Sequence, residues 1–126
     1  FKLQRDEVRR RVTEALDRFE LADRAEHSPH TLSGGEKQML ALASVLVIQP
    51  DTIIADEPTT LLDLRNRRRI VRELLALQQQ LIVVTHDLEM LREFERVLVI
   101  DDGSLVFDGA PSDAIEFYTD LMDAKP

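Results

Sequence analysis

Apolar residues recur at helical spacing near the start of the chain. Residues 5–19 show this spacing and predict an amphipathic helix. Residues 37–48 are apolar on nearly every face, which is typical of a buried helix, and this helix must end before Pro50. The polar stretch between the two segments is expected to be a loop.

Short runs rich in β-branched residues follow, and helical stretches separate them. The runs span residues 52–55, 81–85 and 97–100, and the first intervening helix is expected over residues 64–79. Such continuous apolar runs are typical of strands buried on both faces of a parallel sheet, with the helices as crossovers. This part of the chain predicts a mostly parallel α/β sheet with flanking helices.

The end of the chain predicts a hairpin and a helix. The sequence Asp101-Asp102-Gly103-Ser104 stands between two strand-like runs and is typical of a hairpin turn. Ser112 is expected to cap the last helix, because a serine oxygen readily accepts a first-turn N–H bond.

Composition limits the classes of function. The chain has 126 residues, 44% of them hydrophobic, which suits one domain or part of one. It starts with Phe1 rather than methionine, as expected of a piece cut from a longer sequence. A formal net charge of -8 argues against a nucleic-acid-binding surface, which needs an excess of lysine and arginine. The chain has no cysteine, which excludes thiolate chemistry, and no apolar run long enough to span a membrane.

Two adjacent carboxylates follow the first strand-like run. Asp56 and Glu57 stand at its carboxyl end, which is where open α/β sheets place their ligands. One carboxylate can hold Mg²⁺ and the next can orient or deprotonate an attacking water, as phosphoryl transfer requires. Acidic residues after strands are also common helix caps and turn formers, and that reading stays open.

A histidine follows the second strand-like run. If the two strands are neighbours, His86 lies at the same sheet edge as Asp56 and Glu57 and can hydrogen-bond a phosphate oxygen or the water. A lone histidine after a strand is more often structural, so its value as a signal lies in the combination with the carboxylates.

The sequence Ser33-Gly34-Gly35-Glu36 starts the buried helix, and its two readings are compatible. Ser33 and Glu36 are three residues apart, as in a capping box. Gly34 and Gly35 expose backbone N–H groups at a helix amino terminus, which is a ready-made site for a phosphate.

The order of these segments resembles that of an ABC-type ATPase domain. Residues 32–38 (LSGGEKQ) resemble the ABC signature, and residues 53–59 (IIADEPT) resemble Walker B. Residues 60–63 (TLLD) are similar to the D-loop, and residues 81–87 (LIVVTHD) to the switch-histidine segment. Four motifs in this order leave little room for coincidence. The glycine-rich Walker A loop, which holds the phosphates in that family, is absent from the sequence.

The resemblance implies part of a P-loop NTPase fold of ABC type. Residues 1–50 would be the end of the helical subdomain with the signature, and residues 51–126 the second part of the catalytic lobe, without its Walker A portion. The complete subunit would bind ATP and Mg²⁺ and hydrolyse ATP. This chain alone would be inactive.

The resemblance also implies roles for individual residues. Glu57 would be the base or water-orienting residue, His86 would contact the γ-phosphate, and Asp56 would serve Mg²⁺. The signature residues would bind the γ-phosphate of a nucleotide held by the opposite subunit, and the D-loop aspartate would work across the dimer interface. The implied cofactor-binding residues are Ser33, Gly34, Gly35, Glu36 and Asp63.

Three positions depart from the family pattern. Glu36 stands where many members have glutamine, and Met39 stands where an arginine usually follows the signature. Leu61 and Leu62 replace the smaller residues common before the D-loop aspartate. No catalytic group is lost, but Met39 puts an ion pair near the signature helix in doubt.

Within the family, residues 28–38 and 43–46 resemble the ATPases of energy-coupling-factor importers, and residues 101–111 are similar to the end of importer ATPase domains. The sequence looks closest to the biotin system. This resemblance implies vitamin or metal-ion uptake, a second ATPase subunit, transmembrane coupling and substrate-binding subunits, and a location on the cytoplasmic face of the cell membrane. The alternatives are an ABC ATPase of chromosome maintenance or translation, and an inactive fragment. The sequence that precedes the chain would separate them.

Overall fold

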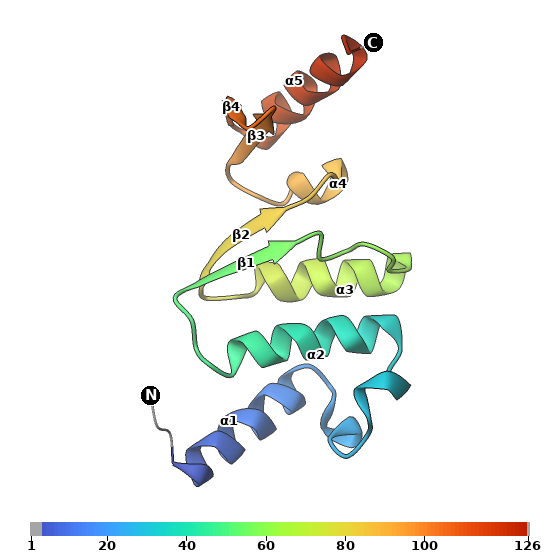
Figure 1. Cartoon of the computed structure of the whole chain (residues 1–126), viewed down its shortest axis with the longest axis vertical. Helices are drawn as coiled ribbons and strands as arrows, with labels where there is room; N and C mark the ends of the chain where they lie inside the picture. Colours follow the sequence, from blue (N-terminus) through green and yellow to red (C-terminus); the bar gives the residue numbers. More distant parts are fainter. Residues whose placement is uncertain (1–3, 126) are drawn as a thin grey trace. The chain divides into compact units, whose positions relative to one another are not determined.

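The helices predicted at the start of the chain form in the computed structural model, which describes residues 4–125 (Figure 1). Helix α1 spans Arg5–Arg18, and two short 3₁₀ turns follow at Ala22–Arg24 (η1) and Pro29–Thr31 (η2). Helix α2 spans Gly34–Leu46, so it begins within the predicted segment 33–36 and ends two residues before the end of its apolar pattern. The chain divides into two units, one up to Val84 and one from Thr85 onward.

Helix α2 is the centre of the first unit, because it contacts both α1 and α3. Its buried side chains include Met39, which is 1% exposed, together with Leu42 and Ala43. The prediction of a buried helix holds for this face, whereas Val45 is 39% exposed. A hydrogen bond of 2.9 Å from the Arg69 guanidinium to the Phe19 carbonyl ties α3 to the end of α1.

The two strands of the first unit, β1 (Thr52–Asp56) and β2 (Gln80–Val84), form the predicted parallel pair. Helix α3 (Leu64–Leu75) is the crossover between them and ends four residues before its expected limit. The register aligns Asp56 with Val84, so the two strands end side by side. The Glu57 amide donates a 2.8 Å hydrogen bond to the Val84 carbonyl and extends the pairing by one residue.

The expectation that these strands are buried on both faces is wrong for the part of the chain that the structure describes. Ile53 is 4% exposed, but Ile54, next to it and on the opposite face, is 70% exposed. Ile82 and Val84 of β2 are also exposed. Successive side chains of a strand point to opposite faces, so the exposed set lies on one face of the sheet.

The second unit contains the predicted hairpin and terminal helix. Strands β3 (Val97–Asp101) and β4 (Ser104–Gly109) pair antiparallel, after a short helix α4 (Leu88–Leu91). Asp102 and Gly103 join them with positive φ values of 45° and 74°, which suits a tight hairpin turn.

Helix α5 (Pro111–Asp123) packs on this hairpin. Val97, Val99 and Ala114 form its buried core, and the rings of Phe107 and Phe117 stack with their centroids 5.1 Å apart. The predicted cap by Ser112 is wrong. The capping position is Ala110, and Pro111 starts the helix, where its missing N–H costs nothing. No helix among residues 4–125 is long and apolar enough to cross a membrane.

Candidate functional site

The first turn of α2 has the capping box that the sequence predicts. The Glu36 amide donates to Ser33 Oγ at 3.2 Å, and the Ser33 amide donates to a Glu36 carboxylate oxygen at 2.8 Å. The Arg24 guanidinium also donates to this carboxylate. The hydrogen bond from the Ser33 amide is the main reason why the pKa of Glu36 lies below its ordinary value.

The capping box satisfies the amide of Glu36 but not the first two amides of the helix. The first N–H groups of a helix have no acceptor within it, and they carry the positive end of the helix dipole. In α2 these groups belong to Gly34 and Gly35, and Ser33 and Gly34 are exposed. This arrangement is chemically suited to an anion such as a phosphate oxygen.

The two glycines differ in their surroundings. A Cβ at Gly34 would meet only Leu62 Cδ2, at 3.9 Å, which is an ordinary contact. A Cβ at Gly35 would overlap the amide oxygen and carbon of Asn66, on α3. Gly35 therefore has no room for a side chain while the Asn66 amide lies beside it, whereas Gly34 has room.

Asp63 is the N-cap of α3 and lies beside the same contact. Its two carboxylate oxygens accept from the backbone N–H and the Nδ2 of Asn66, at 2.9 and 3.0 Å. The first of these bonds is the main cause that lowers the pKa of Asp63. The sequence-predicted residues Gly35 and Asp63 are thus brought together by Asn66, which no motif pointed to. The only sequence signal was an asparagine three residues after an aspartate that starts a helix.

Asp56 and Glu57 lie at the carboxyl end of the parallel pair, as predicted. Asp56 is the last residue of β1 and is exposed. Glu57 has a positive φ of 46°, and the Thr60 hydroxyl donates to its carboxylate at 3.4 Å. A glutamate in the left-handed region stores conformational strain, a feature that clusters at functional sites.

The residues at this strand end fit a magnesium ion only with help from a ligand. Among residues 4–125, no group of three or more histidine and carboxylate side chains could hold a metal ion. Mg²⁺ does not require such a cage, because it keeps several waters and is commonly held by one or two carboxylates and by substrate phosphates. Asp56, exposed at the strand end, meets that requirement.

His86 lies two residues after β2, in the segment that starts the second unit, and it is exposed. Its expected place beside Asp56 and Glu57 remains a prediction. The parallel pairing of β1 with β2, which that expectation required, is confirmed.

The departures from the family pattern have different surroundings. Met39 is one of the largest fully buried side chains, so the core of the first unit accommodates an apolar residue there. Leu61 is 99% exposed and has a φ of 62°, a conformation that glycine adopts without cost. Its side chain therefore contributes no packing within the described chain.

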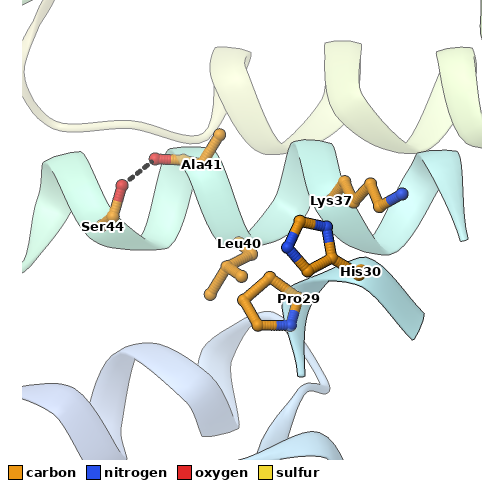
Figure 2. A pocket seen from close by; sticks show the side chains of 6 residues that line it. All are labelled: Pro29, His30, Lys37, Leu40, Ala41 and Ser44. Atoms are coloured by element: carbon orange, nitrogen blue, oxygen red, sulfur yellow. Dashed lines mark hydrogen bonds between the residues drawn. The ribbon is translucent and has the colours of Figure 1, made fainter. Parts of the chain in front are cut away.

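A separate groove lies between η2 and α2 (Figure 2). Its volume is about 700 Å³, and none of the predicted site residues lines it. The lining residues are Pro29, His30, Lys37, Leu40, Ala41 and Ser44.

Comparison with known proteins relates the site to one family. A family model described as "ABC transporter" matches residues 2–60. The chain is 50% identical over 121 residues to a putative ABC transporter ATP-binding protein of Deinococcus radiodurans, covering 96% of this chain and 54% of that protein. It is 44% identical to the biotin transport ATP-binding protein BioM of Rhizobium etli, covering 94% and 53%. It is 40% identical to the energy-coupling factor transporter ATP-binding protein EcfA1 of Clostridium novyi, covering 84% and 39%.

Solved structures show the same relation. Part of the structure of cbiO1 from Clostridium perfringens, described as part of the ABC transporter complex cbiONQ, superposes with a TM-score of 0.82 at 31% identity, covering 98% of this chain and 51% of that one. The dimeric structure of MJ0796, a bacterial ABC transporter cassette, gives a TM-score of 0.73 at 34% identity, covering 88% and 50%. The chain spans about half the length of the curated relatives it matches.

The capping box predicts a specific pH dependence of stability. Because the folded-state pKa of Glu36 lies below 4.5, its contribution is present above that pH and is lost as the pH falls through the lowered value. In Glu36→Gln the amide oxygen accepts the same bond at every pH. As the pH falls from about 5 to about 3, the unmodified chain should therefore lose unfolding free energy relative to Glu36→Gln. Urea unfolding across this range measures it, and a constant difference would contradict the assignment.

Proposed function

Because the chain is a homologue of ABC transporter ATP-binding proteins and has part of their ATPase fold, we propose that it is the carboxyl-terminal part of an ATP-hydrolysing importer subunit. One observation carries this proposal. The first unit contains both a helix amino terminus whose first two amides have no acceptor within the helix and a parallel strand whose end carries two adjacent carboxylates. These are the two kinds of backbone end that phosphoryl-transfer sites use.

Three residues of the chain have separate roles in the proposed hydrolysis of ATP. Glu57 would orient or deprotonate the attacking water, and Asp56 would hold Mg²⁺ directly or through water. His86 donates a ring N–H hydrogen bond to an oxygen of the γ-phosphate. When bound, Mg²⁺ neutralises charge that develops on the phosphate oxygens.

The signature residues act on a nucleotide held by a second ATPase subunit. Ser33, Gly34 and Gly35 present their outward groups to its γ-phosphate, with Glu36 holding the turn through the capping box. Asp63 reaches the same interface. The dimeric cassette among the similar structures supports the pairing of two ATPase subunits.

The transported substrate is proposed from the relatives. Names of relatives that include a biotin transport protein and an energy-coupling factor protein support a vitamin or metal-ion importer. Such a subunit works with transmembrane coupling and substrate-binding subunits, at the cytoplasmic face of the membrane. The same names favour transport over chromosome maintenance or translation.

The role of Glu57 predicts a separation of binding from turnover. Glu57→Gln in the complete subunit should keep ATP affinity and lower steady-state turnover by about 100-fold or more, since an amide is a poor base of similar shape. Nucleotide affinity and phosphate release are the two measurements. Glu73→Gln, a carboxylate on α3, is the matched control and should retain turnover. Unchanged turnover in Glu57→Gln would remove Glu57 from the mechanism.

The signature role is best tested at Gly34, where a side chain fits. Gly34→Asp places a carboxylate in the first turn of α2, which favours the helix dipole, so thermal stability should be kept. The same charge repels a γ-phosphate, so ATP-driven dimers should be lost in a Glu57→Gln background. Light scattering reports the dimers. Gly34→Asn has the same size without the charge and should dimerise more readily, and dimerisation of the Asp variant at unchanged protein concentration would contradict the role.

The chain of 126 residues is expected to leave ATP unbound. Asp56 and Glu57 face an anionic ligand without the lysine and N–H groups of a Walker A loop, which its sequence lacks. A ligand stabilises only a protein that binds it, so millimolar Mg-ATP should leave the melting temperature unchanged. Micromolar affinity by calorimetry would show that the nucleotide site lies elsewhere in this chain.

A further inference from the structure

One side chain connects the signature segment to the D-loop segment. Asn66 is in the first turn of α3, where its backbone N–H and its Nδ2 bond to different oxygens of Asp63, at 2.9 and 3.0 Å. Since Nδ2 faces the carboxylate, the Oδ1 edge of the same amide is directed elsewhere. The helix that contacts α3 in the first unit is α2, which lies beside it in Figure 1.

The Oδ1 edge fills the space beside Gly35. A Cβ built on Gly35 would overlap Asn66 Oδ1 and Cγ and would lie 2.9 Å from Nδ2. Gly35 is buried and has no side chain, so the side-chain amide of Asn66 packs against the backbone of α2. A second, looser contact joins the same segments, because the Cβ position of Gly34 lies 3.9 Å from Leu62 Cδ2.

We propose that Asn66 is a positioning residue that fixes the amides of Gly34 and Gly35 relative to Asp63. The proposal rests on the proposed function, in which both segments engage the second subunit. Asn66 itself touches no nucleotide in this account. The Nδ2 hydrogen bond of Asn66 holds the Asp63 carboxylate, and the packing of its amide against Gly35 sets the distance between α2 and α3. One side-chain amide therefore determines where both interface segments lie.

The positions of the Gly34 and Gly35 amides and of Asp63 matter because these groups must meet the nucleotide of the second subunit at defined distances. Donors that stabilise a transferring phosphate must be held near their final places, and a misplacement of about 1 Å costs about 100-fold in rate. Binding of the nucleotide by its own subunit does not depend on this geometry. Loss of Asn66 should thus affect turnover much more than nucleotide affinity.

The first test is Asn66→Ala in the complete subunit. It removes the Nδ2 bond and the packing beside Gly35, while the backbone N–H of residue 66 still caps to Asp63. We expect kcat to fall by about 10-fold to 100-fold with KM within about twofold. Arg68→Ala, a change at an exposed position of α3 two residues after Asn66, is the matched control and should keep both constants.

The second test keeps the size of the side chain and changes its hydrogen bond. Asn66→Asp fills the same space but sets a carboxylate against Asp63. Two adjacent carboxylates share a proton at lower pH, and a shared proton restores a donor between them. The kcat of Asn66→Asp relative to the unmodified subunit should therefore rise as the pH falls from about 7 to about 5, whereas that of Asn66→Ala should not. A role in stability alone would not produce this difference.

The outcomes separate the two proposals. If folded Asn66→Ala has the same kcat as the unmodified subunit, the positioning role is overturned and the proposed function is left intact. If Asn66→Ala fails to fold, the pH profile of Asn66→Asp decides, and a flat profile overturns the role. Absence of ATPase activity in the unmodified complete subunit instead overturns the proposed function.

Discussion

The close approach of α2 to the first turn of α3 is the constraint on which the candidate site depends. Gly35 has no side chain, and the Asn66 amide occupies the space that one would need. Both helices start at this contact, so both must also satisfy the unpaired N–H groups of their first turns. Ser33 and Asp63 do this as caps. Packing and capping together place the two motif segments in one unit and leave their polar groups outward.

The strand end is organised by backbone hydrogen bonds in a similar way. The Glu57 amide bonds to the Val84 carbonyl, and the Thr60 amide bonds to the Glu57 carbonyl at 3.2 Å. These bonds hold a turn in which Glu57 and Leu61 both have positive φ values. A left-handed conformation costs a residue with a side chain about 1–2 kcal/mol. Backbone strain at Glu57 and Leu61 is therefore part of the turn that leads from β1 to α3.

The exposed face of the sheet fits the partial coverage of the relatives. Ile54, Ile82 and Val84 are among the exposed large apolar side chains, while Ile53 on the other face is buried. Exposed apolar area costs about 25 cal/mol per Å², so this face is stabilised by any structure that covers it. The chain corresponds to about half of the relatives from Deinococcus radiodurans and Rhizobium etli.

The sequence by itself determined the local elements. The apolar spacing predicted α1 and α2, the β-branched runs predicted β1 and β2, and Ser33 with Glu36 predicted the capping box, because these features depend on residues a few positions apart. Only the tertiary structure decided which face of the sheet is exposed and why Gly35 must be glycine. The role of Asn66 was hidden for the same reason. Its contact with Gly35 joins residues distant in sequence, and no periodicity or motif records which side chains meet when two helices pack.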